Sequence, residues 1–104
     1  MSARIFTSKV IHEVYAERVA QEAKWGEQNH PDGTSWDDWA FQRDYARTEC
    51  DTAHQAGEGT WRHILLEEVL EAFAEDDPDK LRAELIQVAA VAVAWVEAID
   101  RRLS

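Results

Sequence analysis

Residues 67–87 read EEVLEAFAEDDPDKLRAELIQ, and this stretch contains the strongest fold signals of the chain. Glu68 and Glu71 are three residues apart, and so are Glu84 and Gln87, so each pair lies on one face of a predicted helix. The apolar residues between the charged ones have helical spacing as well. The stretch therefore predicts two consecutive helices, each with a polar pair on one face.

The two predicted helices meet at Asp77–Pro78, where a capping residue precedes a proline at the first helical position. Both polar pairs are equally distant from this junction. An antiparallel fold-back about it sets Glu68 opposite Gln87 and Glu71 opposite Glu84. Three carboxylates and one amide would then form an oxygen-rich cluster, which suits a hard cation such as Mg²⁺. The alternative is that these acidic residues form a solvated helix end.

The rest of the chain also has helical rather than strand patterning, and it contains no repeat and no low-complexity tract. We expect an all-α fold in which four helices cover residues 5–23, 35–55, 60–75 and 77–102. Ser35, Thr60 and Asp77 are the predicted N-caps. The helix over residues 35–55 has the weakest apolar pattern, and a broken helix or a partial loop stays open there.

Two of the predicted helices have marked apolar surfaces. In the first, the apolar stripe consists of Ile11, Val14, Tyr15 and Val19. In the last, residues 88–96 are apolar on every side, so we expect that helix to be buried on every side. It would lie either at the centre of the fold or in a subunit interface.

Composition limits the class of protein. With 104 residues the chain is expected to be a single domain, residues 1–104. Its net charge of −10 argues against binding to duplex nucleic acid. One cysteine, Cys50, excludes an internal disulfide and a multi-cysteine zinc site. No signal-peptide pattern and no membrane-spanning apolar run are present, so we expect a cytoplasmic protein without a membrane partner.

The segment after the first helix combines an aromatic ring with several hydrogen-bonding groups. Lys24, Trp25, Gln28 and His30 fall within seven residues, and Gly26 is placed to end the helix. Loops with such residues on a helical scaffold are often binding segments. The alternative is that Trp25 is a core anchor and His30 a turn residue.

These motifs together resemble the MazG-like all-α nucleoside triphosphate pyrophosphohydrolases. The motif of that superfamily is Glu-x-x-Glu, a spacer, and Glu-x-x-Asp on the next helix; here Glu68-x-x-Glu71 is followed, after twelve residues, by Glu84-x-x-Gln87. The flanking segments at residues 24–30 and 84–90 are similar to phage and bacterial members. The resemblance covers most of the chain except the region of the second helix.

The resemblance implies a four-helix MazG-like bundle that is completed by a homodimer or homotetramer, and a nucleoside triphosphate pyrophosphohydrolase activity. The implied cofactor is Mg²⁺, with Mn²⁺ as the alternative, and the implied metal ligands are Glu68, Glu71, Glu84 and Gln87. Glu67 and Glu68 are the catalytic candidates, because Glu67 or another acidic neighbour would accept the proton of the attacking water. The implied contacts with the base or sugar are made by Lys24, Trp25, Gln28 and His30.

This chain departs from the family pattern at one ligand, where Gln87 replaces Asp. An amide oxygen can coordinate Mg²⁺ but brings no charge, so the site has one negative charge fewer. The departure keeps two other readings open: a non-catalytic helical module that binds nucleotide or a partner, and a structural bundle with solvated acidic pairs.

Overall fold

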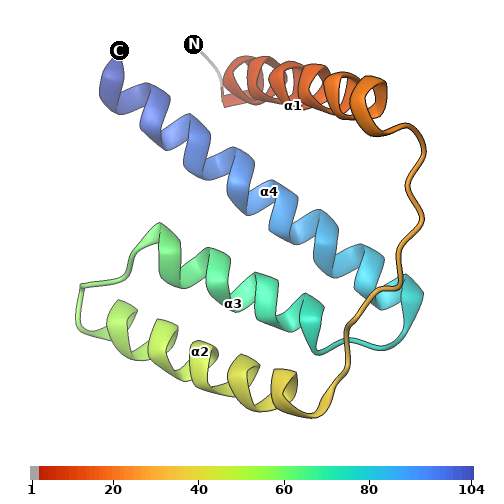
Figure 1. Cartoon of the computed structure of the whole chain (residues 1–104). Helices are drawn as coiled ribbons and strands as arrows, with labels where there is room; N and C mark the ends of the chain where they lie inside the picture. The colour runs from red at the N-terminus through yellow and green to blue at the C-terminus, as the bar shows by residue number, and fades with distance from the viewer. Residues whose placement is uncertain (1–2) are drawn as a thin grey trace. The chain divides into compact units, whose positions relative to one another are not determined.

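The computed structural model describes residues 3–104, with side chains described for residues 6–36 and 38–104. Within these residues the regular structure is entirely helical, which confirms the all-α expectation (Figure 1). The four helices are α1 (Ala3–Trp25), α2 (Asp37–Gln55), α3 (Trp61–Phe73) and α4 (Pro78–Leu103). Each begins and ends within about two residues of the bounds expected from the sequence.

The start of α2 differs from the expectation. Ser35, the predicted cap, has a left-handed backbone with φ of 63° and lies outside the helix. Trp36 takes the N-cap position with an extended backbone, and its side chain makes no capping hydrogen bond. The backbone N–H of Ser35 instead donates to the carbonyl oxygen of Phe73 at 2.7 Å, so this residue ties the segment before α2 to the end of α3. From Asp37 onward α2 is unbroken.

The connection between α2 and α3 follows its local sequence chemistry. Gly57 has a φ of 74°, a left-handed conformation that is easy for glycine, and it follows the end of α2 closely. Thr60 caps α3 as predicted: its side-chain oxygen accepts from the backbone N–H of His63 at 3.2 Å. In return, Nδ1 of His63 accepts from the backbone N–H of Thr60 at 3.1 Å. This reciprocal arrangement is a capping box with histidine in place of the usual glutamate.

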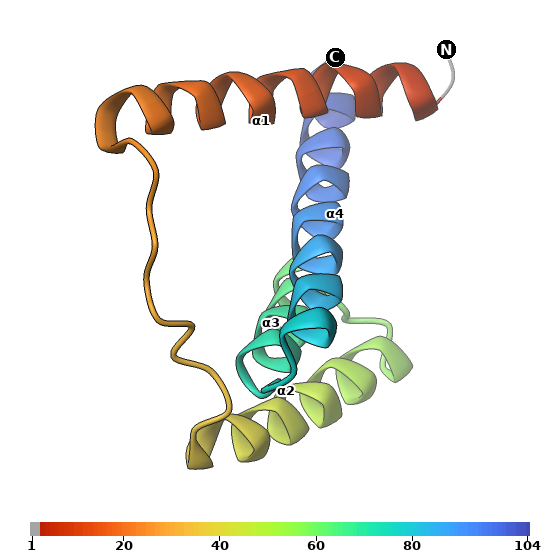
Figure 2. The same cartoon turned by 90° about the vertical axis from the view of Figure 1, so that its right-hand side faces the viewer.

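The turn between α3 and α4 is also as predicted. Oδ1 of Asp77 accepts a hydrogen bond from the backbone N–H of Asp79 at 2.9 Å, and Pro78 is the first residue of α4. Asp77 is therefore the cap of α4. The turn reverses the chain direction, so α4 begins beside the end of α3 (Figures 1 and 2).

The chain divides into two compact units, of which one comprises Met1–Pro31 with Val93–Ser104 and the other Asp32–Ala92. The single domain expected from the length stays a prediction. In the second unit, α2 packs against α3. The rings of Trp39 and Phe73 meet edge to face with centroids 5.0 Å apart. The buried apolar side chains of this unit are Ala46, Cys50, Leu70, Ala72 and Leu81.

Much apolar surface stays accessible. Among the described residues no large side chain is fully buried. The stripe of α1 is about half exposed at Ile11, Val14 and Val19, and more so at Tyr15. Residues 88–96 are not buried on every side within the chain, because Ala89, Ala90 and Val96 are exposed. This corrects the expectation of a fully buried central helix, and the alternative of a subunit interface stays a prediction. No helix in the described part of the chain has the length and apolarity to cross a membrane.

Candidate metal centre

Three carboxylates come together where α3 passes the first turns of α4. Glu68 and Glu71 are one turn apart on α3, and Glu84 lies on α4. One oxygen from each lies within 4.8 Å of one oxygen from each of the others, and all three side chains are half-buried. The helix reversal at Asp77–Pro78 produces this approach, as the symmetric spacing predicted. Gln87, which is one turn beyond Glu84, is exposed, so its part in the cluster stays a prediction.

The donor set fits a hard cation. Oε2 of Glu68 and Oε2 of Glu84 are buried, and neither has a hydrogen-bond partner among the described residues. A buried carboxylate oxygen without a donor is costly, and a cation removes that cost. Two oxygens on one Mg²⁺ are at most about 4.2 Å apart, because each lies about 2.1 Å from the ion. Small side-chain rotations are therefore enough to close the three oxygens on one ion.

The carboxylates of the cluster repel one another, and this repulsion adds to burial in raising the pKa values of Glu68 and Glu84. Burial raises the pKa of Glu68 above its ordinary value of 4.5, and repulsion from Glu71, Glu84 and Glu67 raises this pKa further. The pKa of Glu84 is raised by burial first, then by the charge of Glu71 and by a hydrogen bond with the same carboxyl. Both shifts mean that the ionised cluster is disfavoured without a counter-ion.

A basic residue that the sequence reasoning missed touches the cluster from α2. Nη2 of Arg47 lies 3.3 Å from Oε1 of Glu71, and Nε lies 3.8 Å from Oε1 of Glu67. The charge of Arg47 also partly offsets the rise in the pKa of Glu84. The sequence held a signal for it: folding α2 against α3 about Gly57–Gly59, by the same mirror argument used at Asp77–Pro78, sets Arg47 opposite the acidic face of α3.

The catalytic candidate Glu67 faces α2 rather than α4. Besides its contact with Arg47, it acts on the pKa of Cys50, whose sulfur lies 3.5 Å from Nδ1 of His54. Burial raises the pKa of the Cys50 thiol to about 11, and the charge of Glu67 contributes to that rise. A thiol with such a pKa is a poor nucleophile. Glu68, the other catalytic candidate, has one of the two buried carboxylate oxygens that lack a hydrogen-bond partner among the described residues.

The four predicted substrate contacts belong to the unit that contains α1. Lys24, Trp25 and Gln28 line a hollow of about 350 Å³ together with residues of the last turns of α1. Nζ of Lys24 lies 4.8 Å from the centre of the Trp25 ring, a cation–π contact. Trp25 is 60% exposed, so it is not a core anchor in this chain. His30 is exposed in the segment that follows.

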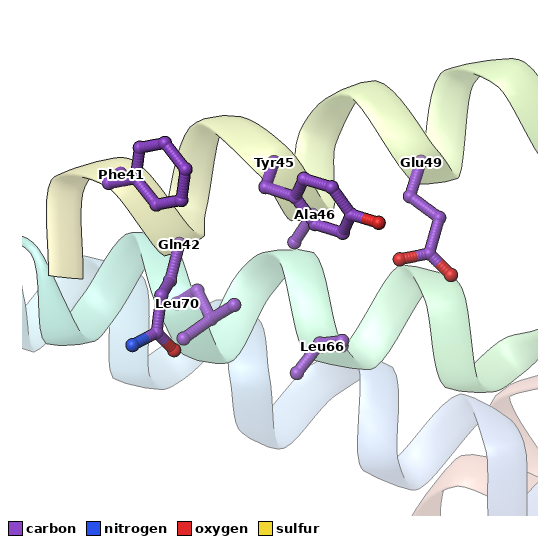
Figure 3. Close-up of a pocket in the computed structure, with 7 residues that line it drawn as sticks. All are labelled: Phe41, Gln42, Tyr45, Ala46, Glu49, Leu66 and Leu70. Carbon is purple, nitrogen blue, oxygen red and sulfur yellow. The ribbon is translucent and has the colours of Figure 1, made fainter. Parts of the chain in front are cut away.

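A second hollow lies on α2 and α3, and it is apolar (Figure 3). Its volume is about 370 Å³, and it is lined by Phe41, Gln42, Tyr45, Ala46, Glu49, Leu66 and Leu70. The one carboxylate in this lining, Glu49, lies 3.6 Å from Nε2 of His63. Its chemistry is that of an apolar contact surface rather than of a cation site.

No family model, no curated protein and no solved structure matches the chain.

Proposed function

We propose that the chain is a Mg²⁺-dependent nucleoside triphosphate pyrophosphohydrolase, which converts a (deoxy)nucleoside triphosphate to the monophosphate and pyrophosphate. The observation that carries the proposal is the meeting of Glu68, Glu71 and Glu84, with two buried oxygens that lack a donor among the described residues. Such a site favours the binding of a cation. An acidic chain needs a cation to bind a triphosphate, because the positive charge screens the phosphates from the protein's carboxylates. The MazG-like resemblance of the motif supplies the reaction.

Glu68, Glu71 and Glu84 would hold the metal through their oxygens, and Gln87 would add a weaker, uncharged ligand. A bound Mg²⁺ in such a site neutralises phosphate oxygens and lowers the pKa of a water molecule. In the reaction, a water oxygen adds to a phosphorus of the α–β anhydride, the bridging P–O bond breaks, and pyrophosphate leaves. A carboxylate accepts the water's proton, with Glu67 and Glu68 as the candidates.

The base and sugar would be bound by Lys24, Trp25, Gln28 and His30. Support comes from the exposure of Trp25 and from the polar lining of the hollow beside it. An exposed indole ring offers a stacking surface for a base. Lys24 already lies over this ring, so a base would either take its place or stack on the opposite ring face.

We infer that the active form is a homodimer or homotetramer. The chain leaves large apolar side chains exposed, among them Leu85 (49%) and Ile86 (57%) on α4 near the carboxylates. Because each of these side chains is already about half buried, covering it completely contributes about half of the ~1.5–3 kcal/mol that full burial of an exposed side chain is worth. A second copy of the chain is the proposed cover.

The alternative function is a non-catalytic helical module that binds nucleotide or a partner through a degenerate metal site. Gln87 supports this alternative, because it is exposed and takes the place of a charged ligand. In that case nucleotide would raise the thermal stability of the protein without being hydrolysed.

The test is a panel of nucleoside and deoxynucleoside triphosphates, with and without Mg²⁺, scored for both pyrophosphate and monophosphate. We expect metal-dependent release of both products, and loss of this release in Glu68→Ala and Glu84→Ala. Glu58→Gln, a charge change in the α2–α3 loop, is the matched control and should keep full activity. Turnover that survives in Glu68→Ala and Glu84→Ala would refute the site. Absence of turnover across the panel, with nucleotide still raising the melting temperature, would favour the alternative.

A further inference from the structure

Arg47 is bound to the carboxylate cluster and at the same time accessible. Its guanidinium lies 3.3 Å from Glu71 and 3.8 Å from Glu67, while 47% of its side chain is exposed. Only the contact with Glu71 is a hydrogen bond among the described residues, because 3.8 Å is too long for one. A guanidinium has five N–H donors in a planar fork. Arg47 therefore keeps donors for a second acceptor.

Glu71 has two competing uses. It is the acceptor for Arg47, and one of its oxygens is also a ligand atom of the candidate metal centre. A carboxylate that ligates a divalent ion attracts a guanidinium much less, because most of its charge is already neutralised. Occupation of the centre therefore weakens the only hydrogen bond that the described residues give to Arg47.

We propose that Arg47 exchanges partners during the catalytic cycle. It neutralises Glu71 while the centre holds no cation, and it binds a phosphate oxygen of the triphosphate once Glu71 ligates the metal. This inference rests on the proposed function. Arginine suits the second role because its fork matches two phosphate oxygens at once. In a chain of net charge −10, it also supplies positive charge beside the centre at which the triphosphate would bind.

The exchange predicts opposite effects of one substitution on two affinities. In Arg47→Gln, the competitor for Glu71 is gone, so Mn²⁺ should bind the nucleotide-free protein roughly fivefold more tightly. At saturating Mn²⁺, a non-hydrolysable deoxynucleoside triphosphate should bind roughly tenfold more weakly, because a charge-assisted hydrogen bond is lost. Electron paramagnetic resonance of free Mn²⁺ measures the first affinity, and calorimetry measures the second.

Arg43 provides the matched control. It lies one turn earlier on α2, and its Nη2 is 3.1 Å from Oδ1 of Asp44. Arg43→Gln removes the same charge from the same helix, and we expect both affinities to stay near those of the unmodified protein. Arg47→Lys keeps the charge but not the fork. It should retain near-normal Mn²⁺ affinity and lose part of the nucleotide affinity, which also guards against a folding defect in Arg47→Gln.

Each outcome separates the two proposals. If the unmodified protein binds no Mn²⁺, the proposed metal-dependent function is overturned. If it binds Mn²⁺ but Arg47→Gln binds the ion no more tightly, or binds nucleotide equally well, the exchange is overturned and the function stands. If Arg43→Gln bound Mn²⁺ as tightly as Arg47→Gln does, the gain in affinity would come from the change in net charge alone. That result would also overturn the exchange.

Discussion

Replacement of Glu84 by glutamine should stabilise the metal-free protein and remove its response to metal. Glu84 contributes one of the three carboxylate oxygens that lie within 4.8 Å of one another. Glutamine keeps the shape of the side chain and removes its charge. Its amide N–H groups can also donate to the remaining carboxylates.

The size of the effect follows from Coulomb's law. Two unit charges at 4.8 Å repel by about 1 kcal/mol in water and by about 3.5 kcal/mol at an effective dielectric constant of about 20. Glu84 takes part in two such pairs, with Glu68 and Glu71. The side chains are only half-buried, and Arg47 offsets part of the repulsion. The repulsion energy of each pair therefore lies near the lower of these two values. We expect Glu84→Gln to gain about 1–2 kcal/mol in free energy of unfolding without metal.

Urea unfolding followed by tryptophan fluorescence measures this gain, since the chain contains five tryptophans. In a chelator, the midpoint for Glu84→Gln should lie above that of the unmodified protein at the same protein concentration. Added Mg²⁺ at about 100 times its Kd should stabilise the unmodified protein by about 2.7 kcal/mol and the variant hardly at all. Glu58→Gln should change neither quantity by more than about 0.5 kcal/mol.

Two results would refute this reasoning. A variant less stable than the unmodified protein in chelator would mean that Glu84 is a structural hydrogen-bond partner rather than a repelled charge. A variant with an undiminished response to Mg²⁺ would mean that the cation binds elsewhere.

Three further predictions follow from the caps, the fourth ligand and the titration of the cluster. Thr60→Ala should lower the free energy of unfolding by about 1 kcal/mol, because the side-chain oxygen that accepts from the backbone N–H of His63 is lost; an unchanged urea midpoint would contradict the capping role. Gln87→Asp should tighten Mg²⁺ binding by roughly tenfold in calorimetry, since it adds a charged ligand; equal affinity would place residue 87 outside the centre. The folded-state pKa values of Glu68 and Glu84 are raised above 4.5, so the folded state binds more protons there than the unfolded state. The contribution of these groups to the stability of the metal-free protein should therefore fall as pH rises above 4.5. The urea midpoint of the Glu68→Gln, Glu84→Gln double variant should depend less on pH in that range than the midpoint of the unmodified protein. An equal pH dependence of the two midpoints would assign the effect to other groups.

The helical hairpin of α3 and α4 could be predicted because its signals are local. Asp77 and Pro78 fix the turn, Thr60 fixes the start of α3, and helical periodicity then sets which side chains share a face. The meeting of Glu71 with Glu84 follows from those features without knowledge of the rest of the fold.

Features that depend on tertiary contacts were missed or wrong. Ser35 is a good cap by composition, but its N–H is engaged by Phe73, far along the chain, and its backbone is left-handed. Arg47 was missed because the thin apolar pattern of α2 left its helix uncertain, so the mirror argument about Gly57–Gly59 was not applied to it. All-round burial of residues 88–96 was expected at the centre of the fold or in a subunit interface, and the described residues of one chain do not provide it. The apolar pattern of residues 88–96 indicates that they need to be covered, but it does not identify the surface that covers them.

The buried thiol of Cys50 gives the protein an internal reporter of its own opening. Only 5% of this residue is exposed, its pKa is raised to about 11 by burial and by its acidic neighbours, and it is the only cysteine in the chain. An alkylating reagent can therefore react rapidly only after α2 separates from α3, which both uncovers the sulfur and lets it ionise. The rate at which Cys50 is alkylated therefore measures how often α2 separates from α3 in the native protein.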